Sequence, residues 1–129
     1  MFMIHLDANL LIAIVRPTDF HYTRGRRVIS GPGPFGCSAV AWMEFHSKPV
    51  HPRDITGTQS ILSAGITPFD EATAALAGEL YCRTGSKRRT RLDTMIAASA
   101  ILAGAELATT NRDDFAAFVP HGLKLHPVD

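Results

Sequence analysis

Three of the twelve acidic residues lie in apolar runs of the sequence, where a charged side chain is least expected. They are Asp7 in IHLDA, Glu44 in AWMEF and Asp93 in LDTMIAA. An ionised carboxylate near an apolar core is unfavourable unless something replaces the water it loses. A divalent cation shared by several carboxylates provides that compensation, and oxygen-only ligands favour a hard ion, Mg²⁺ or Mn²⁺.

Each of these acids also has an interpretation that involves no chemistry. Asp7 is suited to cap a following helix through the amide of Asn9 or Leu10. Glu44 fits an exposed helix position, and Asp93 fits an N-cap placed against a helix dipole. The functional interpretation requires that all three meet at one edge of the fold, because independent caps need not do so.

The elements that must position these acids alternate between strand and helix. Short apolar runs predict strands at residues 3–6, 35–38, 65–69, 106–109 and 123–126. Helical spacing predicts helices at residues 10–16, 20–29, 39–48, 53–64, 71–84, 92–103 and 113–118, with Ser38 and Asp70 as N-caps and Gly104 as a C-terminal stop. The alternation predicts a single α/β domain over residues 1–129, a three-layer α/β/α sandwich around a mostly parallel sheet of about five strands.

In such a sheet, ligands bind at the carboxyl ends of the strands, next to the topological switch point. Asp7 ends the first predicted strand, and Glu44 lies about two helical turns beyond the second. Asp93 opens the helix that precedes the fourth strand, and Asn111 follows that strand. We therefore expect these four side chains to converge on one edge, although they are spread over most of the chain.

Four segments of the sequence resemble the four motifs of PIN domains. They are LDAN at residues 6–9, SAVAWMEF at 38–45, LDTMIAASA at 92–100 and LATTNRDDF at 107–115. Their order and spacing are most similar to those of the VapC-type toxin ribonucleases of toxin–antitoxin pairs. The resemblance implies a PIN-like fold and a Mg²⁺-dependent endoribonuclease that hydrolyses RNA phosphodiester bonds, with Mn²⁺ as a substitute ion.

The same resemblance assigns roles to the acids. It implies that Asp7 and Asp93 are metal ligands and that Glu44 completes the catalytic cluster, directly or through a bound water. Asn111 occupies the strand-end position of the family's fourth acid. Asp114 is the carboxylate that matches the family's Asn-x-x-Asp-Phe variant, and we prefer it to Asp113 as the fourth catalytic residue.

Basic and amide side chains beside the acids are candidates for positioning RNA, because phosphate contacts usually fall to Lys and Arg. The run SKRRTR at residues 86–91 ends two residues before Asp93. The candidate substrate-positioning residues are Asn9, Asn111, Lys87, Arg88, Arg89 and Arg91. A solvated loop is the alternative interpretation of this run. A second basic helix face, with RNA or an acidic partner as its target, comprises Arg24, Arg26 and Arg27.

Composition excludes several other classes of protein. A net charge of +1 excludes a polycation, so RNA binding requires a local patch. Two cysteines without a CxxC pair and six histidines without HxH or HxxxH spacing disfavour a zinc site and fit reduced thiols. No apolar run reaches the roughly 20 residues of a membrane span, and no signal peptide is evident, so we expect a cytoplasmic protein.

Partners follow from the resemblance alone. It implies a homodimer that is silenced by a cognate antitoxin, whose C-terminal segment lies along the active-site groove. Phe20, Tyr22 and Trp42 are candidates for a dimer surface and equally for the core.

Two other functions remain open from the sequence. One is a Mg²⁺-dependent phosphatase or phosphotransferase with Asp7 as the covalent nucleophile, although such enzymes commonly have a second Asp where this chain has Asn9. The other is an inactive PIN scaffold that acts as a binding module, which the neutral Asn111 permits.

Overall fold

A computed structural model describes residues 2–129 of the chain, which form a five-stranded sheet in which every strand is parallel to its neighbours. The strands are β1 (Ile4–Leu6), β2 (Phe35–Ser38), β3 (Gly65–Thr67), β4 (Glu106–Ala108) and β5 (Lys124–Leu125). Their spatial order is β3-β2-β1-β4-β5. The predicted α/β class and the parallel sheet are confirmed.

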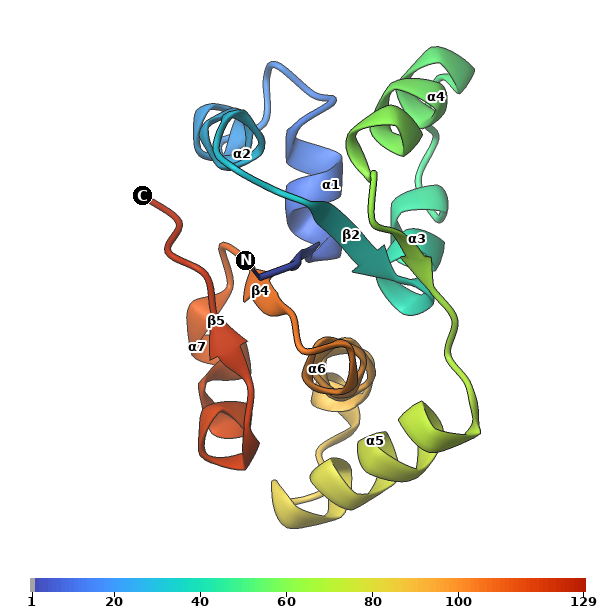
Figure 1. Ribbon diagram of the computed structural model, residues 1–129, viewed down its shortest axis with the longest axis vertical. Helices are drawn as coiled ribbons and strands as arrows, with labels where there is room; N and C mark the ends of the chain where they lie inside the picture. Colours follow the sequence, from blue (N-terminus) through green and yellow to red (C-terminus); the bar gives the residue numbers. More distant parts are fainter. Residues whose placement is uncertain (1) are drawn as a thin grey trace.

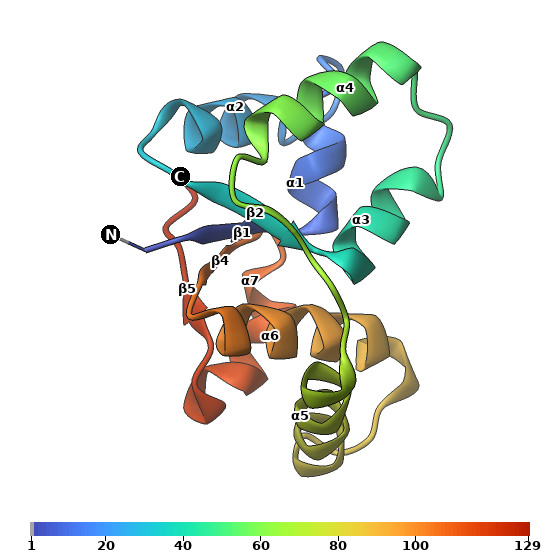
Figure 2. The ribbon, with the colours of Figure 1, turned by 45° about the vertical axis from the view of Figure 1, so that its right-hand side comes forward.

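Helices cover both faces of this sheet and give three layers. Their bounds are α1 (Ala8–Ala13), α2 (Tyr22–Ser30), α3 (Ala39–His46), α4 (Pro52–Ile61), α5 (Glu71–Arg83), α6 (Arg91–Ala103) and α7 (Arg112–Phe115), with short 3₁₀ turns η1 (Arg88–Thr90) and η2 (Ala116–His121). Figures 1 and 2 show α1, α2 and α4 on one side of the sheet and α5 and α6 on the other. No helix in residues 2–129 has the length and apolar character needed to cross a membrane.

Local sequence signals account for most of the element boundaries. The Ser38 side chain accepts from the Ala41 N–H at the start of α3, and Asp70 accepts from the Thr73 N–H at the start of α5. Gly104 ends α6 in the left-handed conformation, at φ 65°, which only glycine adopts without a steric penalty. The predicted helix at residues 113–118 is instead split into α7 and η2, and Pro120 lies inside η2.

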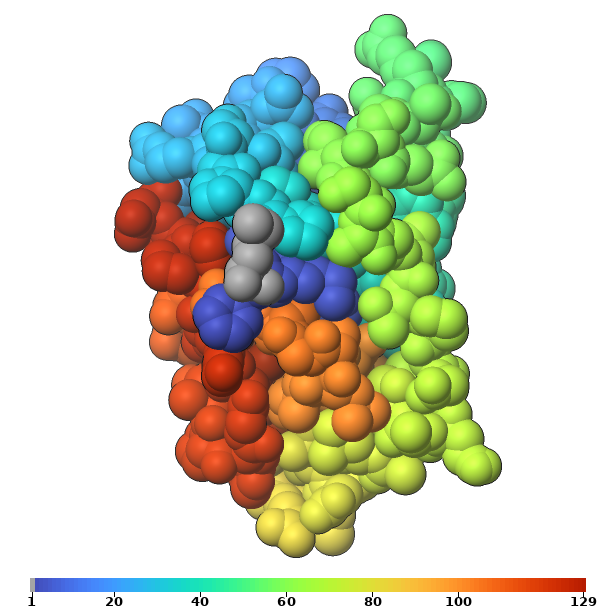
Figure 3. Space-filling view, in the orientation of Figure 1, coloured from blue at the N-terminus to red at the C-terminus, as the bar shows by residue number. Residues whose placement is uncertain are grey.

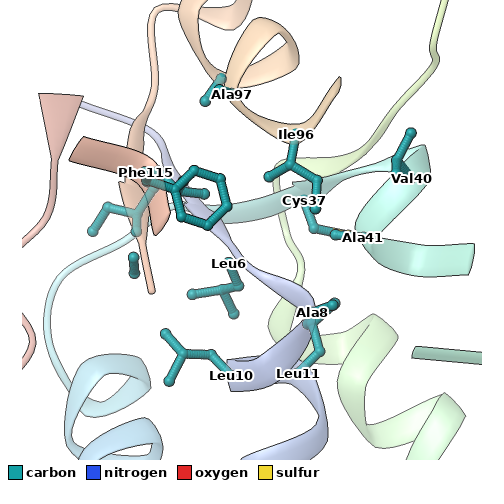
Figure 4. Packing of buried hydrophobic residues seen from close by; sticks show 14 of the residues in the cluster. Leu6, Ala8, Leu10, Leu11, Cys37, Val40, Ala41, Ile96, Ala97 and Phe115 are labelled. Carbon is teal, nitrogen blue, oxygen red and sulfur yellow. The ribbon is translucent and has the colours of Figure 1, made fainter. Parts of the chain in front are cut away.

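The hydrophobic core fills both sides of the sheet. Figure 4 shows Leu6 and Leu10 on one side of β1, and Ile96 from α6 on the other. Trp42 stacks on the buried Phe45 ring, with centroids 5.2 Å apart, so it contributes to packing. Phe20 is 85% exposed and does not.

The C-terminal segment returns to the helix α2 side of the molecule. Figure 3 shows this segment, in red, at the surface below the light-blue residues of α2. The Arg27 guanidinium donates to the Asp129 carbonyl oxygen at 2.9 Å. Arg27 is therefore engaged within the chain.

Candidate active site

The carboxyl ends of β1 and β4 lie side by side where the strand order reverses. The chain runs from β1 outward to β2 and β3, and then returns to β4 on the opposite side of β1. Leu6 pairs with Ala108, and the Asp7 backbone N–H donates to the Ala108 carbonyl at 3.0 Å. Asp7 therefore sits at the switch point, where ligands of open α/β sheets bind.

The Asp7 carboxylate is held by two hydrogen bonds and is only 3% exposed. Its Oδ1 accepts from the Ala8 N–H at 2.8 Å, and its Oδ2 accepts from the Thr109 hydroxyl at 2.7 Å. Asp7 does cap α1, but the expected partner was wrong: the amide is that of Ala8, and not that of Asn9 or Leu10.

Thr109 is a site residue that the sequence analysis missed. It is fully buried, and while its hydroxyl donates to Asp7, the hydroxyl oxygen accepts from the Asn111 N–H at 3.0 Å. The bond joins residues 102 positions apart. The sequence shows only a hydroxyl residue directly after the fourth strand. That position indicates a contact with Asp7 only once β4 is known to pair with β1.

Removal of the Thr109 hydroxyl is expected to destabilise the protein. In Thr109→Val, a buried carboxylate loses a charge-assisted hydrogen bond, which costs about 1.5–3 kcal/mol. Thr110→Val is the control, because the buried Thr110 hydroxyl has no hydrogen-bond partner in the described chain, and its loss should be neutral or stabilising. Urea unfolding at pH 8 in EDTA measures the free energy of unfolding of both variants. Equal values for Thr109→Val and Thr110→Val would contradict a stabilising hydrogen bond from Thr109 to Asp7.

The other three candidate acids come from three different helices. Glu44 lies in α3 and is half-buried, Asp93 lies in the first turn of α6 and is half-buried, and Asp114 lies in α7 and is exposed. Asp93 is not the N-cap: Thr90 holds that position and makes no side-chain capping bond. The capping interpretation therefore leaves the Asp93 carboxylate unexplained.

The charges of these acids act on one another across the site. Burial raises the pKa of Asp93 to about 7, with further repulsion from Asp7, Asp114 and Glu44. Burial is also the main cause that raises the pKa of Asp7 and of Glu44, despite the two hydrogen bonds to Asp7. The structure thus brings all four carboxylates within electrostatic reach, and each ionised member raises the cost of ionising the next.

A cleft of about 310 Å³ opens beside these acids. Asp93 and Asp114 line it on the acidic side, and Lys87 and Arg89 contribute two cations to its wall. Neither cation forms an ion pair within residues 2–129. Both charges are therefore available to an anionic ligand.

Comparison with known proteins identifies the family. A family model described as the PIN domain matches residues 4–119. This chain belongs to the PIN domain family. Among curated proteins, none matches the sequence of this PIN domain.

Solved structures with the same fold include a toxin–antitoxin complex. FitAcB from Neisseria gonorrhoeae has a TM-score of 0.73 at 21% identity, with 97% of each chain covered. VapBC2 from Rickettsia felis, solved on a promoter DNA fragment, has a TM-score of 0.71 at 19% identity, with 99% of this chain and 100% of that chain covered. A Klebsiella pneumoniae toxin–antitoxin complex has a TM-score of 0.68 at 24% identity, covering 88% and 90%. At these identities the likeness establishes the fold.

The other predicted positioning residues of this PIN domain lie in different surroundings. Arg91 lies over the Tyr81 ring, 5.6 Å from its centroid, and lines a separate apolar groove between α5 and α6. Arg88 is exposed in η1 and does not line the cleft. Asn9 is exposed on α1, and Asn111 is exposed at the start of α7 without a side-chain capping bond. The basic run is thus divided between two surfaces.

The second basic group, on α2, is engaged with aromatic rings. The Arg24 and Arg26 guanidiniums each lie 5.9 Å from a ring centroid, over Phe20 and Tyr22 respectively. The Arg26 guanidinium also donates to the Ile14 carbonyl at 3.3 Å.

The donor set of the PIN domain fits a hydrated Mg²⁺ ion. In residues 2–129, no three His, Cys, Asp or Glu side chains form a preassembled metal cage. Mg²⁺ does not need one, because it keeps several waters and is usually bound by one or two carboxylates together with substrate phosphate. Asp7 and Asp93 offer carboxylate oxygens for that role, and a bound cation would offset the burial and the like-charge repulsion that raise their pKa values.

Proposed function

We propose that this PIN domain is a Mg²⁺-dependent endoribonuclease, the toxin of a VapBC-type toxin–antitoxin pair acting in the cytoplasm. One observation carries the proposal: mutually repelling carboxylates gather at the switch point beside a cleft lined by Lys87 and Arg89, two cations that form no ion pair within residues 2–129. Family membership and the toxin–antitoxin neighbours support it.

Asp7 and Asp93 would hold the metal ion, with Mn²⁺ as a substitute. When bound, the ion offsets the repulsion between carboxylates and phosphate and polarises the scissile phosphodiester. Thr109 and the Ala8 amide fix the Asp7 oxygens, so the carboxylate is oriented before substrate enters. Glu44 or Asp114 accepts a proton from the attacking water.

The two functions left open by the sequence have less support. Phosphatases with a covalent Asp nucleophile commonly have a second Asp two residues later, whereas this chain has the exposed Asn9 there, and membership of the PIN domain family supports a nuclease. A protein that only binds a partner does not need a cluster of carboxylates whose ionisation is unfavourable, such as Asp7, Glu44 and Asp93. Incubation of the protein with single-stranded RNA in Mg²⁺, and in parallel in EDTA, tests the proposal: cleavage only with Mg²⁺ is expected, and no cleavage under either condition would contradict it.

The cleft cations would bind backbone phosphates of the substrate. Lys87→Ala/Arg89→Ala should lower RNA affinity and reduce the slope of log affinity against log salt by about 1.4, which is about 0.7 for each lost single-strand phosphate contact. Arg88→Ala is the control, since this exposed neighbour does not line the cleft. Fluorescence anisotropy over a salt series measures both slopes. If the double variant retained the wild-type slope, the phosphate-binding role would be wrong.

Two protein partners are part of the proposal. A cognate antitoxin is supported by the neighbouring structures, which include a toxin–antitoxin complex. A homodimer is proposed on the resemblance to the VapC-type subfamily. Of the three aromatic candidates for a subunit surface, Phe20 has the exposure that such a contact needs, whereas Trp42 packs on Phe45.

A further inference from the structure

Asp114, the exposed member of the acidic cluster, lies in a very short element. Helix α7 has only four residues, and its N-cap, Asn111, makes no side-chain capping bond. A helix of one turn gains too little from its own hydrogen bonds to be stable alone, so contacts with the rest of the chain must hold it. The position of the Asp114 carboxylate therefore depends on the contacts that anchor α7.

The buried side of α7 has two such anchors. The Asn111 N–H donates to the Thr109 hydroxyl at 3.0 Å, which ties the start of α7 to the residue that follows β4. At the other end of α7, the fully buried Phe115 ring lies 6.2 Å from the Phe118 ring, measured between centroids. Both contacts act on the inner side of the helix and leave its exposed side to be fixed by another group.

The third anchor is an arginine at the first residue of α7. The Arg112 guanidinium, which is exposed, donates to the His126 carbonyl oxygen at 3.0 Å. His126 is itself held at two points: its N–H donates to the Leu107 carbonyl at 2.8 Å, and its ring Nδ1 lies 2.8 Å from Glu106 Oε1. Since Glu106 and Leu107 belong to β4, Arg112 links α7 to the central sheet through the residue that follows β5.

The place of the Asp114 carboxylate matters for the proposed chemistry. Burial is the main cause that raises the pKa of Asp93, and repulsion from Asp7 and Asp114 adds to it, so the Asp114 charge reaches the other acids. One role proposed above for Asp114 is to accept a proton from the attacking water, which requires a heavy-atom distance of about 2.6–3.2 Å. A displacement of about 1 Å is enough to slow such a step about a hundredfold.

We propose that Arg112 is a positioning residue, which sets the place of the Asp114 carboxylate by tying α7 to the His126 carbonyl. This role rests on the proposed nuclease function and adds how its exposed acid is held. Arg112 acts through Asp114 and does not bind the RNA, because its guanidinium is engaged by the C-terminal segment of the chain.

The test removes this anchor and compares it with a matched bond elsewhere. Arg112→Ala breaks the contact to the His126 carbonyl. Arg27→Ala is the control, because Arg27 makes the same kind of bond to the same segment, from its guanidinium to the Asp129 carbonyl at 2.9 Å, but lies in α2. Arg112→Lys is the conservative variant, since an ammonium group also donates to a carbonyl.

Two measurements are made on each variant. Steady-state cleavage of a labelled single-stranded RNA in Mg²⁺ gives kcat and KM separately. Amide hydrogen exchange of the metal-free protein in EDTA follows the N–H groups of Asp114 and Ala116, which donate to the Asn111 and Asp113 carbonyls within and beside α7. The exchange rates report on the order of α7 whether or not the protein is active.

Arg112→Ala is expected to lower kcat about 10–100-fold with KM within about twofold of wild type, since the loss affects the chemical step and not substrate binding. Exchange of the two amides should become about fivefold faster, because α7 opens more often. Arg112→Lys should recover most of the lost kcat. Arg27→Ala should stay within about twofold of wild type in both measurements, as is usual for exposed substitutions.

Three results would overturn the positioning role while RNA cleavage by the wild-type protein leaves the proposed function standing. Unchanged exchange at both amides would show that Arg112 does not hold α7. Faster exchange with unchanged kcat would show that the anchor has no effect on the reaction. A raised KM at unchanged kcat would assign Arg112 to RNA binding instead. If the wild-type protein cleaves no RNA, the proposed function and the positioning role fail together.

Discussion

Asp7→Asn should lower kcat/KM for Mg²⁺-dependent RNA cleavage by about a thousandfold or more. The substitution preserves the shape of the side chain and one carbonyl oxygen for the Ala8 amide, so α1 keeps its cap. It removes the negative charge that would hold the ion. Charge stabilisation by such an ion is worth several kcal/mol, and each 1.4 kcal/mol corresponds to about a factor of ten in rate.

The matched control is Asp70→Asn, which makes the same chemical change at the N-cap of α5, a residue that does not line the acidic cleft. Its activity should stay within about twofold of wild type, since Asn and Asp cap helices almost equally well. Gel-resolved cleavage of a labelled single-stranded RNA gives both rates. Undiminished turnover by Asp7→Asn would refute the metal site and, with it, the proposed chemistry.

Asp93→Asn should make the metal-free protein more stable above neutral pH, although it removes activity. The folded-state pKa of Asp93 is about 7, above its ordinary value of 3.8, because burial and neighbouring carboxylates oppose ionisation. The native state therefore binds this proton more tightly than the unfolded chain, and stability falls as pH rises through 7. The half-buried position and solvent screening reduce the cost of the charge to about 1–2 kcal/mol at pH 8, or roughly 5 °C in Tm.

Thermal unfolding in EDTA at pH 5.5 and pH 8 checks the sign of this effect. Wild type should lose stability between the two pH values, and Asp93→Asn should lose less. Addition of Mg²⁺ at pH 8 should then raise the Tm of wild type, because ion binding adds about 2.7 kcal/mol to the free energy of unfolding at a hundredfold excess over Kd. The Tm of Asp93→Asn should stay nearly unchanged. A variant that is less stable than wild type in EDTA at pH 8 would show that the ionised Asp93 carboxylate stabilises the fold.

The alternation of strand and helix signals in the sequence was sufficient to predict the α/β architecture and the edge of the sheet at which the acids gather. Strand and helix signals alternate strongly, and parallel strands with helical crossovers bring their carboxyl ends to one edge. Ser38, Asp70 and Gly104 end elements through local chemistry, which depends on neighbouring residues only. These features were therefore accessible without coordinates.

Long-range packing decided the rest. Thr109 reaches Asp7 only because β4 pairs with β1 in one particular register, and a shift by one residue would turn its hydroxyl to the opposite face. Long-range packing also divides the basic run. Arg89 in η1 lines the acidic cleft, whereas Arg91, two residues later in the first turn of α6, lies over the Tyr81 ring. The direction of a side chain depends on the elements packed around it. Sequence spacing was therefore enough to predict that Arg89 and Arg91 lie near the site, but only the tertiary structure shows which of them faces it.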